Sequence, residues 1–265
     1  MRLSSDERDE LGYAKSLLEN PGLAAKITNA IGAPIERGLT LLPAKWSDAV
    51  NRATRAALWK ALDAAVATVS DNGPRRSADA LHRMIVAATG ATGGAFGLPA
   101  LLVELPISTT IMLRSIVDVA RSQGERIKEI ETKLACIEVF ALGSPSKRDN
   151  ASETGYFAVR AALATTVSEA AQFIAERGLA QEGAPALVRL IAQVAARFGV
   201  VVSEKAAAQA VPVIGAVGGA AINLIFIKHF QDMARGHFIV RRLERAHGQE
   251  VVRAEYETMI MRSTE

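Results

Sequence analysis

The chain has 265 residues, of which 49% are hydrophobic, 22% are charged and only 5% are aromatic. This composition excludes a disordered chain, because it supplies enough apolar surface for a substantial core. The net charge of +3 is compatible with anionic partners without selecting one, and a single cysteine, Cys136, excludes an intrachain disulfide. The scarcity of alternating β-branched residues predicts an all-α protein.

The first 45 residues are predicted to form N-terminal helices ahead of the main domain. Ser4 or Ser5 caps the first helix, which ends at the Asn-Pro-Gly sequence of residues 20–22. The second helix covers roughly residues 23–41 and is weakened by two glycines and a proline. The N-terminus has no apolar segment typical of a signal peptide, so we expect a cytoplasmic protein.

The main domain is predicted to span residues 46–265. Helices with an apolar stripe are expected over residues 47–69, 127–141, 156–174 and 187–198. Residues 143–150 form the clearest loop in the sequence. If the domain contains an internal repeat, this loop divides its two halves.

Two long stretches that are almost free of charge organise the domain. The first, Ile85–Leu113, carries Glu104 as its only charge, and the second, Ala206–Ile227, carries none. The first is long enough to cross a bilayer, but its glycines and prolines disfavour one straight helix. It is instead predicted to form two apolar segments joined at residues 97–99.

The same glycine pattern occurs in both stretches. Each contains the sequence GAxGGA, at residues 90–95 and 215–220, and each is followed by DxAR, at residues 118–121 and 232–235. Glycines spaced as GxxxG leave a groove in which another backbone can approach closely. We therefore predict a single multi-helix domain with two glycine-rich apolar hairpins packed centrally. The packing glycines are Gly90, Gly93, Gly94, Gly97, Gly215, Gly218 and Gly219.

Several motifs together resemble the EcsC family of bacterial proteins. They are GATGGAFGLP (90–99), LRSIVDVARSQG (113–124), CIEVFALG (136–143), VPVIGAVGGAAIN (211–223) and HFIVRRLER (237–245). The resemblance extends from about residue 40 onward, with Glu104 where the family usually has an aspartate. It implies the fold class more than the function, because the family has no settled activity. Its name comes from a gene beside an ABC-type transporter, which makes such a transporter a candidate partner.

Glu104 is the first candidate site residue, because a carboxylate inside an apolar run must be paired, protonated or hydrated. Arg114 and Asp118 lie one helical turn apart nearby, and Asn223 is the amide of the second stretch. These four residues are hypothesised to form a buried cluster that binds a polar headgroup or a small ligand. The favoured alternative is a structural ion-pair network that fixes helix register.

Recognisable catalytic motifs are absent: the sequence has no P-loop, GxSxG, HExxH or paired CxxC. His229 and Asp232 are spaced to interact on a helix but lack a third metal ligand, so we expect neither metal nor cofactor. No nucleic-acid recognition module is visible. A hydrolase-like or ligand-binding activity at the Glu104 cluster is the alternative function.

The preferred function is non-enzymatic association with anionic membrane lipid or with a membrane transporter. The apolar stretches fit either the core of a soluble helical domain or lipid insertion. In both cases a basic helix after Ile227 would contact the headgroups or the partner, at the inner face of the cell membrane. The predicted contact residues are Lys228, Arg235, Arg241, Arg242 and Arg245. The sequence does not predict the oligomeric state.

Overall fold

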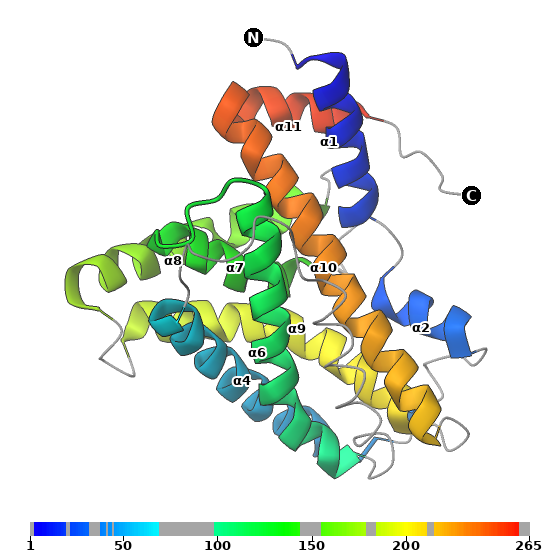
Figure 1. Ribbon diagram of the computed structural model, residues 1–265. Helices are drawn as coiled ribbons and strands as arrows, with labels where there is room; N and C mark the ends of the chain where they lie inside the picture. The colour runs from blue at the N-terminus through cyan, green and yellow to red at the C-terminus, as the bar shows by residue number, and fades with distance from the viewer. Residues whose placement is uncertain are drawn as a thin grey trace.

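The computed structural model describes residues 3–19, 22–31, 38–40, 42–43, 45–68, 98–143, 155–178, 184–210 and 215–259. Within these ranges the regular elements are all α-helices, which confirms the all-α prediction (Figure 1). They are α1 (Ser5–Leu18), α2 (Leu23–Ile31), α4 (Trp46–Thr68), α6 (Leu98–Ser122), α7 (Ile130–Leu142), α8 (Gly155–Arg177), α9 (Pro185–Ala210), α10 (Gly215–His247) and α11 (Gln249–Thr258).

Helix α1 begins with the capping predicted from the sequence. The Ser4 hydroxyl accepts a hydrogen bond from the backbone N–H of Glu7, and the Glu7 carboxylate accepts one from the N–H of Ser4. This capping box satisfies N–H groups that a helix start otherwise leaves unpaired. Helix α2 covers Leu23–Ile31, and residues 32–37 and 41 of the predicted second helix lie outside the described residues. Helix α11 was not predicted as a separate element; it follows Gly248, which has a φ of 91°.

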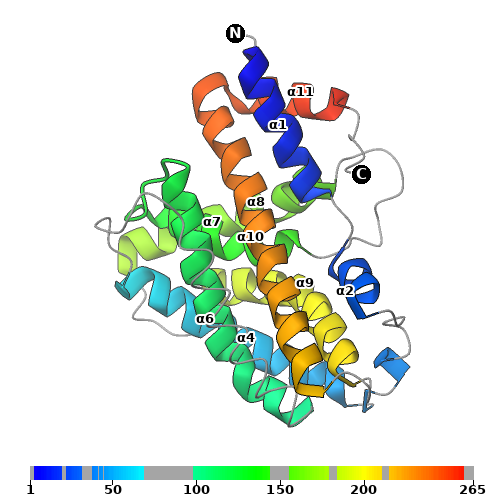
Figure 2. The same cartoon turned by 45° about the vertical axis from the view of Figure 1, so that its right-hand side comes forward.

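Helix α10 is the central element of the fold. It joins the last part of the predicted uncharged segment, from Gly215, to the predicted basic helix without a break, and α1, α2, α6, α7, α9 and α11 all contact it (Figures 1 and 2). Its Phe226 and Phe230 meet Phe140 of α7 and Phe198 of α9. The ring centroids of contacting pairs are 4.9 to 6.2 Å apart. These tilted and edge-on contacts hold three helices around one aromatic core.

The structure describes only some of the residues predicted to form the glycine-rich hairpins. Gly90, Gly93, Gly94 and Gly97 lie outside the described residues. The second stretch, residues 206–227, is divided between the end of α9 and the first turns of α10, where Gly215, Gly218 and Gly219 are helical. The central packing of these glycines, and the internal repeat, stay predictions.

Helices α6 and α10 lie side by side and run parallel. Asn223 of α10 donates to Glu104 of α6, and further along both helices Gln231 donates to Ser115. Both helices begin at the lower end of the molecule in Figure 1, where α9 also ends. The described parts of the two stretches that are poor in charge therefore lie at the same end of the molecule.

We call this lower region the uncharged end and define it by residues 98–110 of α6, 200–210 of α9 and 215–227 of α10. The charged side chains in these spans are Glu104, Glu204 and Lys205, and all three are buried. Burial raises the pKa of Glu204 to about 7, which favours its neutral form. The described surface of these three spans therefore carries almost no charge, although the first turns of α4, which packs against α6 and α9, add the exposed Asp48, Arg52 and Arg55 beside them.

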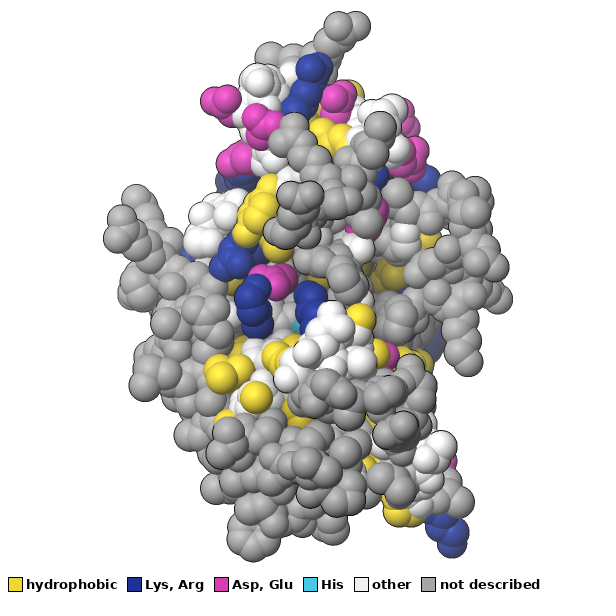
Figure 3. All heavy atoms as spheres, turned by 90° about the vertical axis from the view of Figure 1, so that its right-hand side faces the viewer, with side chains coloured by type: hydrophobic (Ala, Val, Ile, Leu, Met, Phe, Trp, Pro, Cys, Tyr) yellow, Lys and Arg dark blue, Asp and Glu magenta, His cyan; other side chains and the backbone are white. Residues whose placement is uncertain are grey.

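The opposite, charged end holds α1, α11 and the last turns of α10. Ion pairs join these helices: Arg8 to Glu255 and Arg242 to Glu10, at 3.0 and 2.6 Å. Lys15 is buried, and its Nζ donates to the carbonyl oxygens of Tyr256 and Met259, both at 2.8 Å. Figure 3 shows that the described acidic and basic side chains on one face lie mostly in its upper half. Among the described residues of this face, charge is thus concentrated around α1, α11 and the last turns of α10.

His229 links α10 to the end of α7. It is buried beside Phe230, and its Nε2 lies 2.9 Å from the carbonyl oxygen of Gly143, to which it donates in the tautomer that forms this bond. Burial lowers the pKa of His229 to about 4, so the ring is neutral at neutral pH. A Cβ at Gly143 would lie 2.5 Å from this nitrogen, which explains the glycine there.

We expect His229 to make the fold sensitive to acid. Its pKa is lowered from 6.5 to about 4, so its contribution to stability is full above pH 6.5 and is lost as the pH falls toward 4. The free energy of unfolding of the wild type, relative to a His229→Gln variant, should fall by about 2–3 kcal/mol over that window. Urea unfolding at several pH values measures it. A pH-independent difference would contradict the prediction.

Candidate functional site

Glu104, Lys205 and Asn223 form a buried polar cluster where α6, α9 and α10 meet. Oε1 of Glu104 accepts hydrogen bonds from Nζ of Lys205 at 2.9 Å and from Nδ2 of Asn223 at 2.8 Å. The side chains of Lys205 and Glu104 are 0% and 6% exposed. Three helices are therefore fixed in register at one oxygen atom.

The ammonium group of Lys205 also lies over the ring of Phe226, 4.9 Å from its centroid. Burial lowers the pKa of Lys205, whereas the Glu104 carboxylate favours the charged form. A charge this deep is tolerated only with a partner, because removing it from water costs several kcal/mol. Each member of the pair therefore makes it possible to bury the other in the apolar junction of the three helices.

The structure brings together two of the four residues proposed for this cluster. Arg114 is exposed on α6, and Asp118 pairs with Arg121 at 2.8 Å. The residue missing from the sequence hypothesis is Lys205, which was visible only as the charge that precedes the second uncharged stretch. Glu104 lines neither of the two pockets that flank α8. The geometry favours a structural ion pair over a ligand site at this position.

The five basic residues predicted to contact lipid or a partner are all in ion pairs within the protein. Lys228 and Arg235 pair with Asp232 at 2.8 and 3.6 Å, and Arg242 pairs with Glu10. Arg241 and Arg245 both pair with Glu125, which follows α6. Their charge is thus largely balanced by neighbouring carboxylates.

Most of these basic residues lie far along α10 from the uncharged end. Arg245 lies 30 residues beyond Gly215 in one continuous helix, which is about 45 Å at ~1.5 Å per residue. The basic turns of α10 are therefore at the charged end, far from the uncharged end. Lys228, 61% exposed and nearer the uncharged end, is the exception. The contact of these basic residues with lipid or a partner stays a prediction.

A second polar centre, which the sequence did not single out, lies around Glu138 of α7. Glu138 is only 7% exposed and makes no hydrogen bond or ion pair with the described residues. Beside it, Arg160 of α8 binds Glu244 of α10 through both guanidinium nitrogens, at 2.7 and 2.9 Å. Burial raises the pKa of Glu138 to about 7, against the opposing effect of Arg160 and Arg241. The sequence signal was the same as for Glu104: one carboxylate in an apolar run.

Behind Arg160, two buried rings complete this centre. The hydroxyl of Tyr156 lies 3.0 Å from Nδ1 of His237, and Arg160 donates to the same hydroxyl at 3.3 Å. Burial lowers the pKa of His237 well below its usual value. The imidazole is therefore neutral and holds the tyrosine in place.

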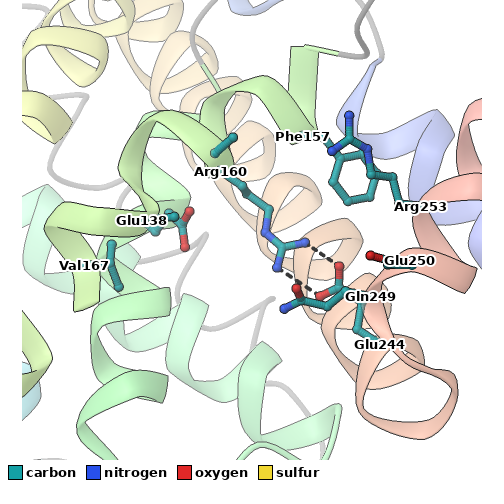
Figure 4. A pocket seen from close by; sticks show the side chains of 10 residues that line it. Glu138, Phe157, Arg160, Val167, Glu244, Gln249, Glu250 and Arg253 are labelled. Carbon is teal, nitrogen blue, oxygen red and sulfur yellow. Dashed lines mark hydrogen bonds and ion pairs between the residues drawn. The ribbon is translucent and has the colours of Figure 1, made fainter.

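Two adjoining pockets flank α8 and share Glu138, Ala164 and Val167, and Figure 4 shows the first of them. The first has a volume of about 370 Å³ and lies against α11, and the second has about 420 Å³ and lies along α7. We call the two together the α8 groove. Figure 4 shows the Glu138 carboxylate turned toward the space that Arg160 and Glu244 also border. Volumes of this size suit a small ligand.

The groove does not resemble a metal centre. Among the described residues, no group of three His, Cys, Asp or Glu side chains is arranged to hold a metal ion. Cys136 is buried beside it on α7, and burial raises the pKa of its thiol, so it is an unreactive core residue.

The comparison with protein families identifies the chain. The model of the EcsC protein family matches residues 14–243. The chain belongs to the EcsC family. The match begins within α1 and ends near the last turns of α10, so all the sites described above fall within the EcsC region except the part formed by α11 and the end of α10. No curated protein and no solved structure matched the chain.

Proposed function

We propose that this EcsC family protein is a non-enzymatic cytoplasmic protein that attaches to lipid at the inner face of the cell membrane through its uncharged end. The observation that supports this most directly is the buried Glu104–Lys205 pair. It removes the charges of α6 and α9 from the surface of that end, at a side-chain exposure of 6% or less. A surface without exposed charge is the condition for lipid contact, because burying a lone charge in the bilayer is costly.

The uncharged end also exposes large apolar side chains. Ile107 of α6, Val200 of α9 and Leu224 of α10 are 48%, 44% and 38% exposed, one on each of the three helices that meet there. Among the described helices, α9 alone is long and apolar enough to cross a bilayer, and half of its apolar window is buried in the protein. We therefore propose peripheral contact with the lipid rather than a membrane span.

Sedimentation with lipid vesicles tests this proposal. We expect the wild type to bind vesicles at both low and high salt, because an apolar contact is not screened by ions. An Ile107→Glu/Leu224→Glu double variant should bind about tenfold or more weakly, since burying one large aliphatic side chain contributes roughly 1.5–3 kcal/mol. The absence of binding to any vesicle composition would refute the proposal.

A matched control lies on the same helix as Val200. Val188 is 42% exposed but sits near the start of α9, about 18 Å away along the helix axis. Val188→Glu should leave vesicle binding unchanged. Binding that disappears at high salt would instead place the contact on basic side chains such as Lys228.

The other candidate functions have less support. An enzyme or ligand-binding site at Glu104 would have only Oε2 available, because Oε1 of Glu104 already accepts two hydrogen bonds from the protein. No contact among the described residues selects an ABC-type transporter as the partner. The uncharged end would serve equally for such a partner, and vesicles without protein distinguish lipid from transporter.

A further inference from the structure

The α8 groove is lined by more acidic than basic side chains. Three basic side chains line it, and each is already paired: Arg160 with Glu244, Arg241 with Glu125 and Arg253 with Glu257. Three further carboxylates line the groove without a bonded partner among the described residues. They are Glu131, Glu138 and Glu250.

Glu138 is the decisive residue of the three, because it is more than nine-tenths buried and still has no partner among the described residues. It borders both pockets, so a ligand in either would meet its carboxylate. An unpaired buried carboxylate is unfavourable unless a donor or a cation satisfies it. Glu131 and Glu250, both exposed, extend the negative charge toward the two ends of the groove.

The cation that fits must be elongated. Glu131 and Glu138 are seven residues apart on one face of α7, which corresponds to about 10 Å along the helix axis. Carboxylates so far apart cannot share one metal ion, in agreement with the absence of a three-residue metal site in the described part of the chain. Between the carboxylates the groove is lined by small apolar side chains of α7 and α8, namely Ala135, Ala161, Ala164, Val167, Ala171 and Ala175.

We propose that the α8 groove binds a linear aliphatic polyamine, with its methylene chain along the alanines of α8 and its ammonium groups at Glu131, Glu138 and Glu250. Each ammonium group would donate charge-assisted hydrogen bonds to a carboxylate, which are stronger than neutral ones. The methylene segments would bury apolar surface that the alanines leave open. This proposal is independent of membrane attachment, because the groove and the uncharged end are separate surfaces.

Binding should depend on pH through Glu138. The charged groups that face it are Arg160 of α8 and Arg241 and Glu244 of α10, so two positive charges and one negative charge surround its carboxylate. The pKa of Glu138 is raised to about 7, so its carboxylate is mostly protonated below that pH and mostly ionised above it. A bound ammonium group must displace the proton at lower pH, so polyamine affinity rises as the pH rises.

Isothermal titration of the full chain with spermidine tests the proposal. We expect binding at about pH 8 and roughly tenfold weaker binding at about pH 6. Glu138→Gln, a substitution of the same shape, should lower the affinity at the higher pH and abolish the pH dependence. Ala164→Leu, on the exposed face of α8, should block binding by filling the groove where its two pockets meet.

The controls separate this site from general attraction to acidic surfaces. Glu169→Gln removes an exposed carboxylate of α8 that pairs with Arg189 outside the groove, and it should leave the affinity unchanged. Putrescine, which is shorter, and Mg²⁺ should bind more weakly than spermidine. The proposal is overturned if spermidine does not bind, if Mg²⁺ competes equally well, or if Glu138→Gln binds spermidine as the wild type does.

Discussion

A Lys205→Met variant is expected to lose about 3–5 kcal/mol of unfolding free energy, because removing one partner of a buried ion pair leaves the other charge uncompensated. Methionine keeps the length and apolar stem of the side chain, so the loss reports the ammonium group rather than a cavity. Glu104 would then be left 6% exposed with only the amide of Asn223 to satisfy it. Urea unfolding followed by circular dichroism measures the change.

The double variant Lys205→Met/Glu104→Gln shows whether the loss of stability comes from the broken ion pair or from altered side-chain packing. It removes both charges but keeps an acceptor for Asn223, and replacing a buried ion pair by neutral groups is often close to neutral in energy. We expect it to recover most of the stability lost in Lys205→Met. Equal destabilisation in the single and double variants would show that the ion pair does not hold the three helices together.

A Gly236→Leu variant is expected to lose about 3 kcal/mol or more, because it forces α1 away from α10. A Cβ at Gly236 would lie 2.7 Å from Cγ of Leu18 and 3.0 Å from the carbonyl oxygen of Ala14. The carbonyl belongs to the backbone of α1, so the clash cannot be relieved by a side-chain rotation alone. Unfolding in urea gives the magnitude, and faster proteolysis within residues 5–18 would locate the change in α1.

The same substitution at Gly12 provides the control. Gly12 is also helical, in α1, but the atom nearest to a Cβ at this position would be Sδ of Met259 at 4.0 Å, an ordinary contact. Leucine favours a helix over glycine by up to about 1 kcal/mol. Gly12→Leu should therefore leave stability equal or slightly higher. A loss similar to that of Gly236→Leu would mean that the close approach at Gly236 is not the cause.

Local features of this fold could be predicted from the sequence because they depend on neighbouring residues. The Ser4 cap of α1 and the apolar stripe of α4 follow from side chains three or four positions apart. The partner of Glu104 could not be predicted in the same way. Lys205 lies 101 residues away, and only the packing of α9 against α6 and α10 brings the two together.

The ion-pair partners of the basic residues of α10 could not be predicted from the sequence either. Counting residues on α10 gives an excess of arginine, but their neutralising partners come from other elements, such as Glu10 of α1 and Glu125 after α6. The Glu138 site was missed for a different reason. Its signal, a lone carboxylate in an apolar helix, was present in residues 136–143, but no spacing in the sequence indicated the groove that α8 forms beside it.

The contact of Lys15 with the carbonyls of Tyr256 and Met259 has a consequence for biosynthesis. The residues joined are more than 240 positions apart in sequence, and contacts of such long range slow folding. Helix α1 is synthesised before α10 and α11, which form the surface that it binds. Its apolar face, with Leu11, Ala14 and Leu17, stays exposed until then. Docking of α1 therefore has to wait until α10 and α11 have been synthesised.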